Sequence, residues 1–325
     1  MKLAPETPAP VVEDLLRIVD TDPFPEGYTS SYWKHYGRQT RLEREGSGLA
    51  LHGSAFGTVT LSSALAPLRA LERLSYRRVT SRLSSCRSVW AVARRLARQL
   101  GFGLTFDIWR QAVALALLTD HWDAQGLSPR RFAFFGDGYG FLSALVRRMR
   151  PESSVYCIDI PKTLVFQACT HTRAEPGASM AVLQPGGDTP AESKVCFVVP
   201  PAVESVPGPI DCAVGIACMQ EMNAFTIAAY FAFLRRRSGP ESRFYCVSRS
   251  RKELPGGEVS CFAEYPWQPE DEIFLDGVCP YYTHFLAPYT LPAGPRVLGI
   301  RVPFVNHFDG VTLHRLAHLA PLGAT

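Results

Sequence analysis

Short apolar runs alternate with segments of helix length in the second half of this chain. We expect strands at residues 132–135, 155–159, 195–199, 212–216 and 244–247. We expect helices between them, at residues 140–150, 161–173 and 223–237. This alternation predicts an α/β fold in which helices cover both faces of a mostly parallel sheet. Residues 297–302 and 311–316 are expected to supply the last strands, with an antiparallel edge.

The residues before this region follow a different pattern. Residues 1–30 are rich in proline, so we expect an arm that wraps around the molecule or frays. Residues 62–119 carry apolar side chains at helical spacing and are predicted to be helical. The expected organisation is an N-terminal arm and helical segment over residues 1–125 and an α/β domain over residues 126–325.

Ten arginines lie between Arg69 and Arg110, against only Glu72 and Asp107. They fall on the polar stripe of the predicted amphipathic helices, which favours a solvated face or a subunit contact. RNA binding stays open as an alternative, because clustered arginines can pair with phosphates.

The composition bounds the class of protein. With 46% hydrophobic and 20% charged residues and a formal net charge of +4, the 325-residue chain is predicted to be globular. The uncharged apolar run at residues 112–118 is too short to span a membrane, and the first residues lack a signal-peptide core, so we expect a cytoplasmic protein. Nine cysteines without a Cys-x-x-Cys pair predict free thiols. His314 and His318 have helical metal-ligand spacing but no glutamate between them, so no metal is expected.

A glycine-rich segment follows the first predicted strand. Gly136, Gly138 and Gly140 stand at alternate positions. A dinucleotide fingerprint, Gly-x-Gly-x-x-Gly, would need its third glycine at the position of bulky Phe141. The lysine of a phosphate-binding loop is also absent. Asp159 ends the next strand, where a carboxylate can accept hydrogen bonds from ribose hydroxyls, although it could also cap the helix that follows. These features predict a nucleoside site.

The segments FFGDGYGFLSALV, CIDIPKTLVFQACT and CAVGIACMQEMNAFTIAAYFAFLR together resemble the sugar O-methyltransferases, a group of class I S-adenosylmethionine (SAM)-dependent methyltransferases. The resemblance covers residues 132–234, and more loosely SSYWKHY at Tyr32 and Trp33 and the tail FDGVTLHRLAHLAP. It implies a Rossmann-like, seven-stranded, mostly parallel sheet, with SAM as cofactor and S-adenosylhomocysteine (SAH) as product. The cofactor contacts that it implies are Gly136, Asp137, Gly138, Gly140, Asp159, Ile160, Ala217 and Cys218.

Two positions depart from the pattern of that family. An acid that reaches the methionine amino group usually stands where this chain has Phe134. Asp137, inside the turn, either takes over that contact or stabilises the turn. The serine of the family is replaced by Cys218, which is small enough to leave room for the cofactor.

Gln220 and Glu221 follow the fourth strand, at the edge of the sheet where open α/β folds bind ligands. Glu221 is a candidate catalytic base, because a carboxylate there could take a proton from the attacking hydroxyl or amine. Alternatively, Glu221 caps the helix that follows. Gln220 is a candidate substrate contact.

An acidic segment lies near the C-terminus. Residues 253–295 contain no lysine or arginine and seven acids, together with several aromatic residues. Aromatic rings and carboxylates suit a glycoside that carries ammonium groups, so we expect substrate contacts from an insertion at about residues 250–295. The predicted contacts are Glu270, Asp271, Tyr281 and Tyr282. The alternative is a solvated insertion that balances the arginine-rich helices, across a subunit contact in a homodimer.

An amine acceptor is protonated at neutral pH and must lose a proton before it attacks. Glu221, His284 and His307 are the candidate catalytic residues. The resemblance then extends to the aminoglycoside N-methyltransferases of gentamicin-type antibiotic pathways. The predicted function is SAM-dependent methyl transfer to an amino or hydroxyl group of a sugar or aminoglycoside natural product, with small cationic glycosides as partners and neither nucleic acid nor membrane. The alternatives are methylation of a neutral sugar and RNA-directed binding.

Overall fold

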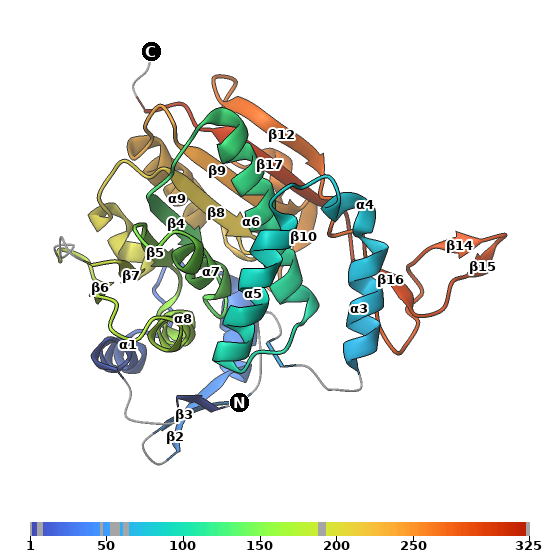
Figure 1. The fold of residues 1–325 in the computed structure, drawn as a ribbon. Coiled ribbons are helices and arrows are strands. Elements are labelled where there is room, and N and C mark those ends of the chain that lie inside the picture. The colour runs from blue at the N-terminus through green and yellow to red at the C-terminus, as the bar shows by residue number, and fades with distance from the viewer. Residues whose placement is uncertain are drawn as a thin grey trace.

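The computed structural model describes residues 2–4, 9–45, 48–52, 59–60, 65–187 and 193–322. An eight-stranded sheet forms its centre (Figure 1). In spatial order its strands are β12 (Glu272–Val278), β17 (Thr312–His318), β9 (Arg243–Arg249), β8 (Cys212–Ile216), β4 (Arg131–Phe135), β5 (Ser154–Ile158), β7 (Val195–Val198) and β6 (Met180–Leu183). β17 is antiparallel to both of its neighbours, and the other neighbouring pairs are parallel.

This topology confirms the predicted Rossmann-like α/β class. The five expected strands correspond to β4, β5, β7, β8 and β9. The sheet has eight strands rather than seven, because β6 adds a parallel strand beside β7. Residues 311–316 belong to β17, which is antiparallel as expected but is not an edge, since β12 covers its outer side. The expectation for residues 297–302 was wrong: they contribute to a separate hairpin of β14 (Arg296–Val297) and β15 (Ile300–Arg301).

Strand β4 is buried on both faces, which explains its unbroken apolar sequence. The Phe132 ring packs against Trp122 of α6 (Phe106–Gln125), whereas Phe135 stacks on Tyr230 of α9 (Ala224–Arg236). Because side chains alternate along a strand, these two contacts lie on opposite faces. The structure therefore has helices on both sides of the sheet.

The remaining helices extend these two layers. α5 (Cys86–Leu100), α7 (Phe141–Met149) and α8 (Pro161–Ala174) pack against one another and, with α6, form one layer. The expected N-terminal arm includes α1 (Pro10–Thr21), which packs on α8 and joins the same hydrophobic core. On the other side, α9 contacts the 3-10 helix η3 (Pro200–Ser205).

Smaller elements complete the N-terminal part. They are a three-stranded sheet of β1 (Lys2–Ala4), β2 (Arg41–Glu45) and β3 (Gly48–His52), and the short helices α2 (Ser31–Tyr36), η1 (Gly37–Gln39), α3 (Ala66–Ser75) and α4 (Arg77–Thr80). Seven arginines of the basic helices are exposed, as a solvated face requires: Arg77, Arg78, Arg82, Arg87, Arg94, Arg95 and Arg98. The other three, Arg69, Arg73 and Arg110, are partly buried.

The acidic segment is largely built into the sheet and its margins. It contains β12, β11 (Val259–Cys261), the 3-10 helix η5 (Phe262–Glu264) and β13 (His284–Leu286). β11 pairs with β10 (Arg251–Glu253), which ends where the segment begins, and β13 pairs with β16 (Val305–His307). The proline and glycine residues of the segment predict an ordered loop, and this expectation was wrong for residues 272–278. Those residues follow a strand pattern and pair with β17.

Several expectations from composition can be compared with the described residues. All nine cysteines are free, as predicted, and most are buried. Among the described residues, no helix is both long enough and apolar enough to cross a bilayer. His314 and His318 lie on strand β17 rather than on a helix, and four residues along a strand span about 13 Å.

Asp271 provides a test of the packing. Its carboxylate forms a buried double pair with Arg235, at 2.6 and 2.9 Å, and accepts hydrogen bonds from the N–H groups of Gln268 and Ala320. Burial raises the pKa of Asp271, but these donors outweigh it and hold the pKa below its usual value. Asp271→Ala leaves a buried guanidinium unpaired, so we expect the free energy of unfolding to fall by about 3–5 kcal/mol in urea titrations. Glu264→Ala, at another exposed acid of the same segment, is the control and should change it by less than about 0.5 kcal/mol.

Candidate functional site

A pocket of about 240 Å³ opens at the carboxyl ends of the central strands. The turn after β4 contributes Gly136 and Gly138, and Asp159 comes from the end of β5. Ala217 and Cys218 follow β8. The position agrees with the rule that open α/β sheets bind ligands at this edge, where strand order reverses.

The turn after β4 depends on two close approaches. A Cβ atom at Gly136 would lie 2.4 Å from Cβ of Cys218, and one at Gly140 would lie 2.9 Å from Cα of Gln167 on α8. Both glycines have positive φ, at 61° and 74°, which other residues rarely adopt. Gly136 lines the pocket, whereas Gly140 does not and instead lets α7 start against α8.

Asp137 lines the pocket and also holds the turn. Its carboxylate accepts hydrogen bonds from the backbone N–H groups of Leu142 (3.3 Å) and Ser143 (2.8 Å), in the first turn of α7. Burial raises the pKa of Asp137 to about 6, and these hydrogen bonds oppose that shift. The turn-stabilising alternative is therefore present in the structure, and contact with a cofactor stays a prediction.

Asp159 is buried at the pocket wall. One carboxylate oxygen accepts from the N–H of Ile160 and the other from Nε2 of Gln167, both at 2.8 Å. Burial raises its pKa to about 8, and the nearby charge of Asp137 raises it further. The predicted contact Ile160 is the buried N-cap residue of α8 and lies outside the pocket lining, whereas Ala217 and Cys218 line it.

Glu221, at the end of the 3-10 helix η4 (Met219–Glu221), points into the pocket region. Nζ of Lys252 lies 2.7 Å from its carboxylate, and the Tyr32 phenol also hydrogen-bonds to it. Burial raises the pKa of Glu221, against the opposing charge of Lys252. The alternative that Glu221 caps α9 was wrong, because Asn223 is the N-cap and accepts from the N–H of Thr226 at 2.8 Å.

The N-terminal segment before α2 is tied across this part of the site. Nδ2 of Asn223 donates to the carbonyl of Gly27 (2.9 Å), and Oγ1 of Thr226 donates to that of Tyr28 (3.1 Å). The Ser30 hydroxyl donates to the carbonyl of Glu221. These contacts bring Tyr32 and its neighbour Trp33 to the pocket. Both belong to the looser part of the resemblance, and no role in the site was predicted for either.

Helix α6 forms a pocket wall that sequence reasoning missed. Asp107, Arg110 and Gln111 line it. Arg110 pairs with Asp107, and its guanidinium lies 4.0 Å from the ring centroid of Tyr282. With a side chain only 14% exposed, Arg110 does not belong to the solvated face in which we had placed it. The available signal was three polar residues at i, i+3 and i+4, just before the apolar run at residues 112–118 of the same helix.

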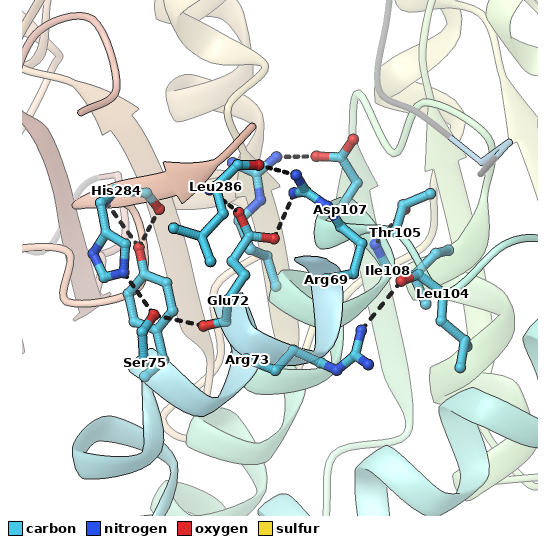
Figure 2. Close-up of polar contacts among 12 residues, drawn as sticks. Arg69, Glu72, Arg73, Ser75, Leu104, Thr105, Asp107, Ile108, His284 and Leu286 are labelled. Atoms are coloured by element: carbon cyan, nitrogen blue, oxygen red, sulfur yellow. Dashed lines mark hydrogen bonds and ion pairs between the residues drawn. The ribbon is translucent and has the colours of Figure 1, made fainter. Parts of the chain in front are cut away.

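The structure does not bring His284 or His307 to the pocket. The His284 ring stacks on Tyr76 at 4.3 Å, and its Nε2 lies 2.6 Å from the Ser75 hydroxyl. Figure 2 shows His284 beside Ser75 of α3. His307 faces His284 in the β13–β16 ladder. β13 packs on α3, and neither histidine lines the pocket, so the structure gives no support to their predicted catalytic role.

Most of the acidic segment also lies elsewhere. None of its seven acids lines the pocket. Glu270 is exposed, and Asp271 is committed to Arg235. Tyr281 is buried against Tyr245 outside the lining. Of the four substrate contacts predicted in this segment, only Tyr282 lines the pocket. Gln220, the fifth predicted substrate contact, lies outside the acidic segment and also lines the pocket, where its side chain accepts from the N–H of Arg249 at 2.7 Å.

No family model and no curated protein sequence matches this chain. Solved structures with a related arrangement include magnesium protoporphyrin IX methyltransferase from Synechocystis PCC 6803 with bound SAM, at 13% identity and a TM-score of 0.38 over 80% of this chain and 100% of that chain. A SAM-dependent methyltransferase from Clostridium acetobutylicum ATCC 824 has 9% identity and a TM-score of 0.36 over 62% of this chain and 89% of that chain. Similarity at this level does not establish an activity or a ligand for this chain.

The pKa of Asp159 predicts a dependence of stability on pH. Its folded pKa of about 8 lies far above the roughly 3.9 of an unfolded aspartate, so the folded state holds the extra proton between these values. The contribution of Asp159 to stability is therefore present below about pH 4 and is lost as the pH rises toward 8. We expect Asp159→Asn to lose less stability than the wild type between pH 5 and pH 8 in denaturant titrations. Parallel curves for the two proteins would contradict the assignment.

Proposed function

We propose that this chain is a SAM-dependent methyltransferase that methylates an oxygen or nitrogen of a small sugar-like molecule. The observation that carries the proposal is the meeting of the glycine turn, Asp159 and Cys218 in one pocket at the carboxyl edge of the sheet. The mostly parallel topology with antiparallel β17 is consistent with it.

The residues of the pocket fit SAM. Gly136 and Gly138 both line the pocket, so a ligand there would meet the backbone of the turn rather than side chains at these two positions. Asp159, at the pocket wall, would accept hydrogen bonds from the ribose hydroxyls. Asp137 would supply the acid for the methionine amino group, because Phe134 has no carboxylate. When bound, SAM supplies an electrophilic methyl group. The chain would contribute binding, orientation and removal of a proton.

Glu221 is the residue proposed to take that proton. Lys252 supports its charged form, and Tyr32 fixes the carboxylate through a hydrogen bond. His284 and His307 are not candidates, because both lie outside the pocket lining. Glu221, Lys252 and Tyr32 form the proposed proton-accepting group.

The pocket itself supports a sugar-like acceptor. Tyr32, Trp33 and Tyr282 present aromatic rings, and Asp107 and Gln111 present hydrogen-bond acceptors. Oε1 of Gln111 is buried and has no hydrogen-bond partner among the residues that the structure describes, so a ligand O–H or N–H group would satisfy it. A ring with an apolar face and peripheral hydroxyl or amino groups matches this set.

The ion pairs of the pocket carboxylates favour one of the two acceptors, a hydroxyl group of a neutral sugar. Asp107 is paired with Arg110 and Glu221 with Lys252, so neither carboxylate faces the pocket without a cation. At these two positions a polycationic aminoglycoside would meet carboxylates that are already paired with a cation. The pocket therefore supports methylation of a neutral sugar, whereas the acidic segment had suggested a cationic aminoglycoside. RNA-directed binding by the exposed arginines stays a prediction without a supporting contact.

A methyl-transfer assay with radiolabelled SAM tests this proposal over a panel of neutral sugars and aminoglycosides. We expect transfer to a member of the panel, and we expect Glu221→Gln to lower kcat by roughly 10²–10⁴, because an amide cannot take the proton. Glu264→Gln, an exposed acid outside the pocket, is the control and should retain activity. No transfer to any member of the panel, or full activity in Glu221→Gln, would contradict the proposal.

A further inference from the structure

A hairpin arm projects from the body of the molecule. Figure 1 shows β14 and β15 extending outward beyond the β13–β16 ladder. We define the arm as residues 287–304. Its large apolar side chains are mostly exposed: Tyr289, Leu291, Val297, Leu298, Ile300 and Phe304. A two-stranded hairpin alone is marginally stable in water, and an apolar surface of this kind marks an interaction site.

The tip of the arm is especially costly to expose. Leu298 is 96% exposed and Ile300 is 75% exposed. Leu298 also has a φ of +50°, in the left-handed region that favours glycine or asparagine. Neither burial within the chain nor local backbone preference accounts for a leucine at this position. A contact with another surface would account for it.

The base of the arm is held firmly. Buried Glu72 of α3 accepts a hydrogen bond from the N–H of Leu286 at 2.6 Å and pairs with Arg69 at 2.5 Å (Figure 2). Within the arm, Arg301 donates to the carbonyl of Ala293 (2.9 Å) and to Oδ1 of Asn306 (3.0 Å). The arm therefore starts from a fixed point on the body.

The arm is basic. Residues 277–308 contain no aspartate or glutamate, while Arg296 and Arg301 give the arm positive charge. Arg296 is exposed beside the tip. A surface that receives the arm should therefore be apolar and acidic, and should offer hydrogen bonds to a strand.

Strand β12 has these properties on the same chain. It is the last strand of the main sheet, with β17 on one side and, within the described residues, no strand on the other. Ile273 and Val278 are exposed on it, and Glu270 and Glu272 are exposed acids at its start. No lysine or arginine occurs at residues 253–295, although such residues commonly protect an open edge.

We propose that the arm of one copy adds to the β12 edge of a second copy, and that the exchange is reciprocal in a two-fold symmetric homodimer. Strand addition supplies backbone hydrogen bonds, the tip leucine covers apolar residues of the edge, and Arg296 faces the acids at its start. A second copy is favoured over another partner because both complementary surfaces are on this chain. The acidic segment, whose acids do not line the pocket, would then serve in the contact between copies.

Sedimentation velocity of the full chain tests the proposal. The wild type is expected to be a dimer that dissociates more readily in high salt, since the contact includes opposite charges. Leu298→Asp is expected to weaken the dimer at least tenfold, with an unchanged circular dichroism spectrum. Leu322→Asp replaces another exposed leucine, outside the arm, and should leave the dimer intact. A monomeric wild type, or an intact dimer in Leu298→Asp, would overturn the proposal.

Cross-linking maps the contact independently of dissociation. A photoreactive benzoylphenylalanine in place of Leu298 is irradiated in an equal mixture of ¹⁵N-labelled and unlabelled chains. Mass spectrometry is expected to find mixed-isotope cross-links to residues 270–278. Cross-links between copies at other segments only would overturn the docking on β12.

Discussion

The close contact between the turn after β4 and its neighbours governs the site. Gly136 leaves room for Cys218, and Gly140 leaves room for the backbone of Gln167. Gln167 in turn donates to Asp159. A side chain at either glycine would push the ends of β4, β5 and β8 apart, and the pocket lies where these ends meet. Because these two glycines lack a Cβ atom, the turn after β4 can lie against both helix α8 and the residues that follow β8.

The parts of the site that lie close in sequence could be predicted. The glycine spacing, Asp159 at a strand end and Glu221 after the fourth strand each follow from local pattern and sheet topology. Arg110 and Tyr32 could not be placed, because their positions depend on how α6 and the N-terminal segment dock on distant elements. The histidines could not be placed for the same reason: His284 hydrogen-bonds to Ser75 of α3, and His307 pairs with His284 across the β13–β16 ladder, which no local pattern records.

Charge is distributed differently from what the sequence suggested. The acidic segment looked like a binding surface for cations, but its acids are spread over an edge strand, a buried pair with Arg235 and exposed turns. The pocket has its own carboxylates, and two of them carry a cation partner. The acidic surface and the basic arm are then two halves of a proposed contact between copies, separate from the pocket in which chemistry is proposed.

Calorimetric titration with SAH tests the central claim most directly, because it needs no knowledge of the acceptor. The account predicts saturable binding to the wild type and at least tenfold weaker binding to Asp159→Ala, while Glu270→Ala binds like the wild type. The predicted contact of Asp159 with ribose hydroxyls is the reason for the difference. Absence of SAH binding to the wild type, or equal binding to the wild type and Asp159→Ala, would contradict the account.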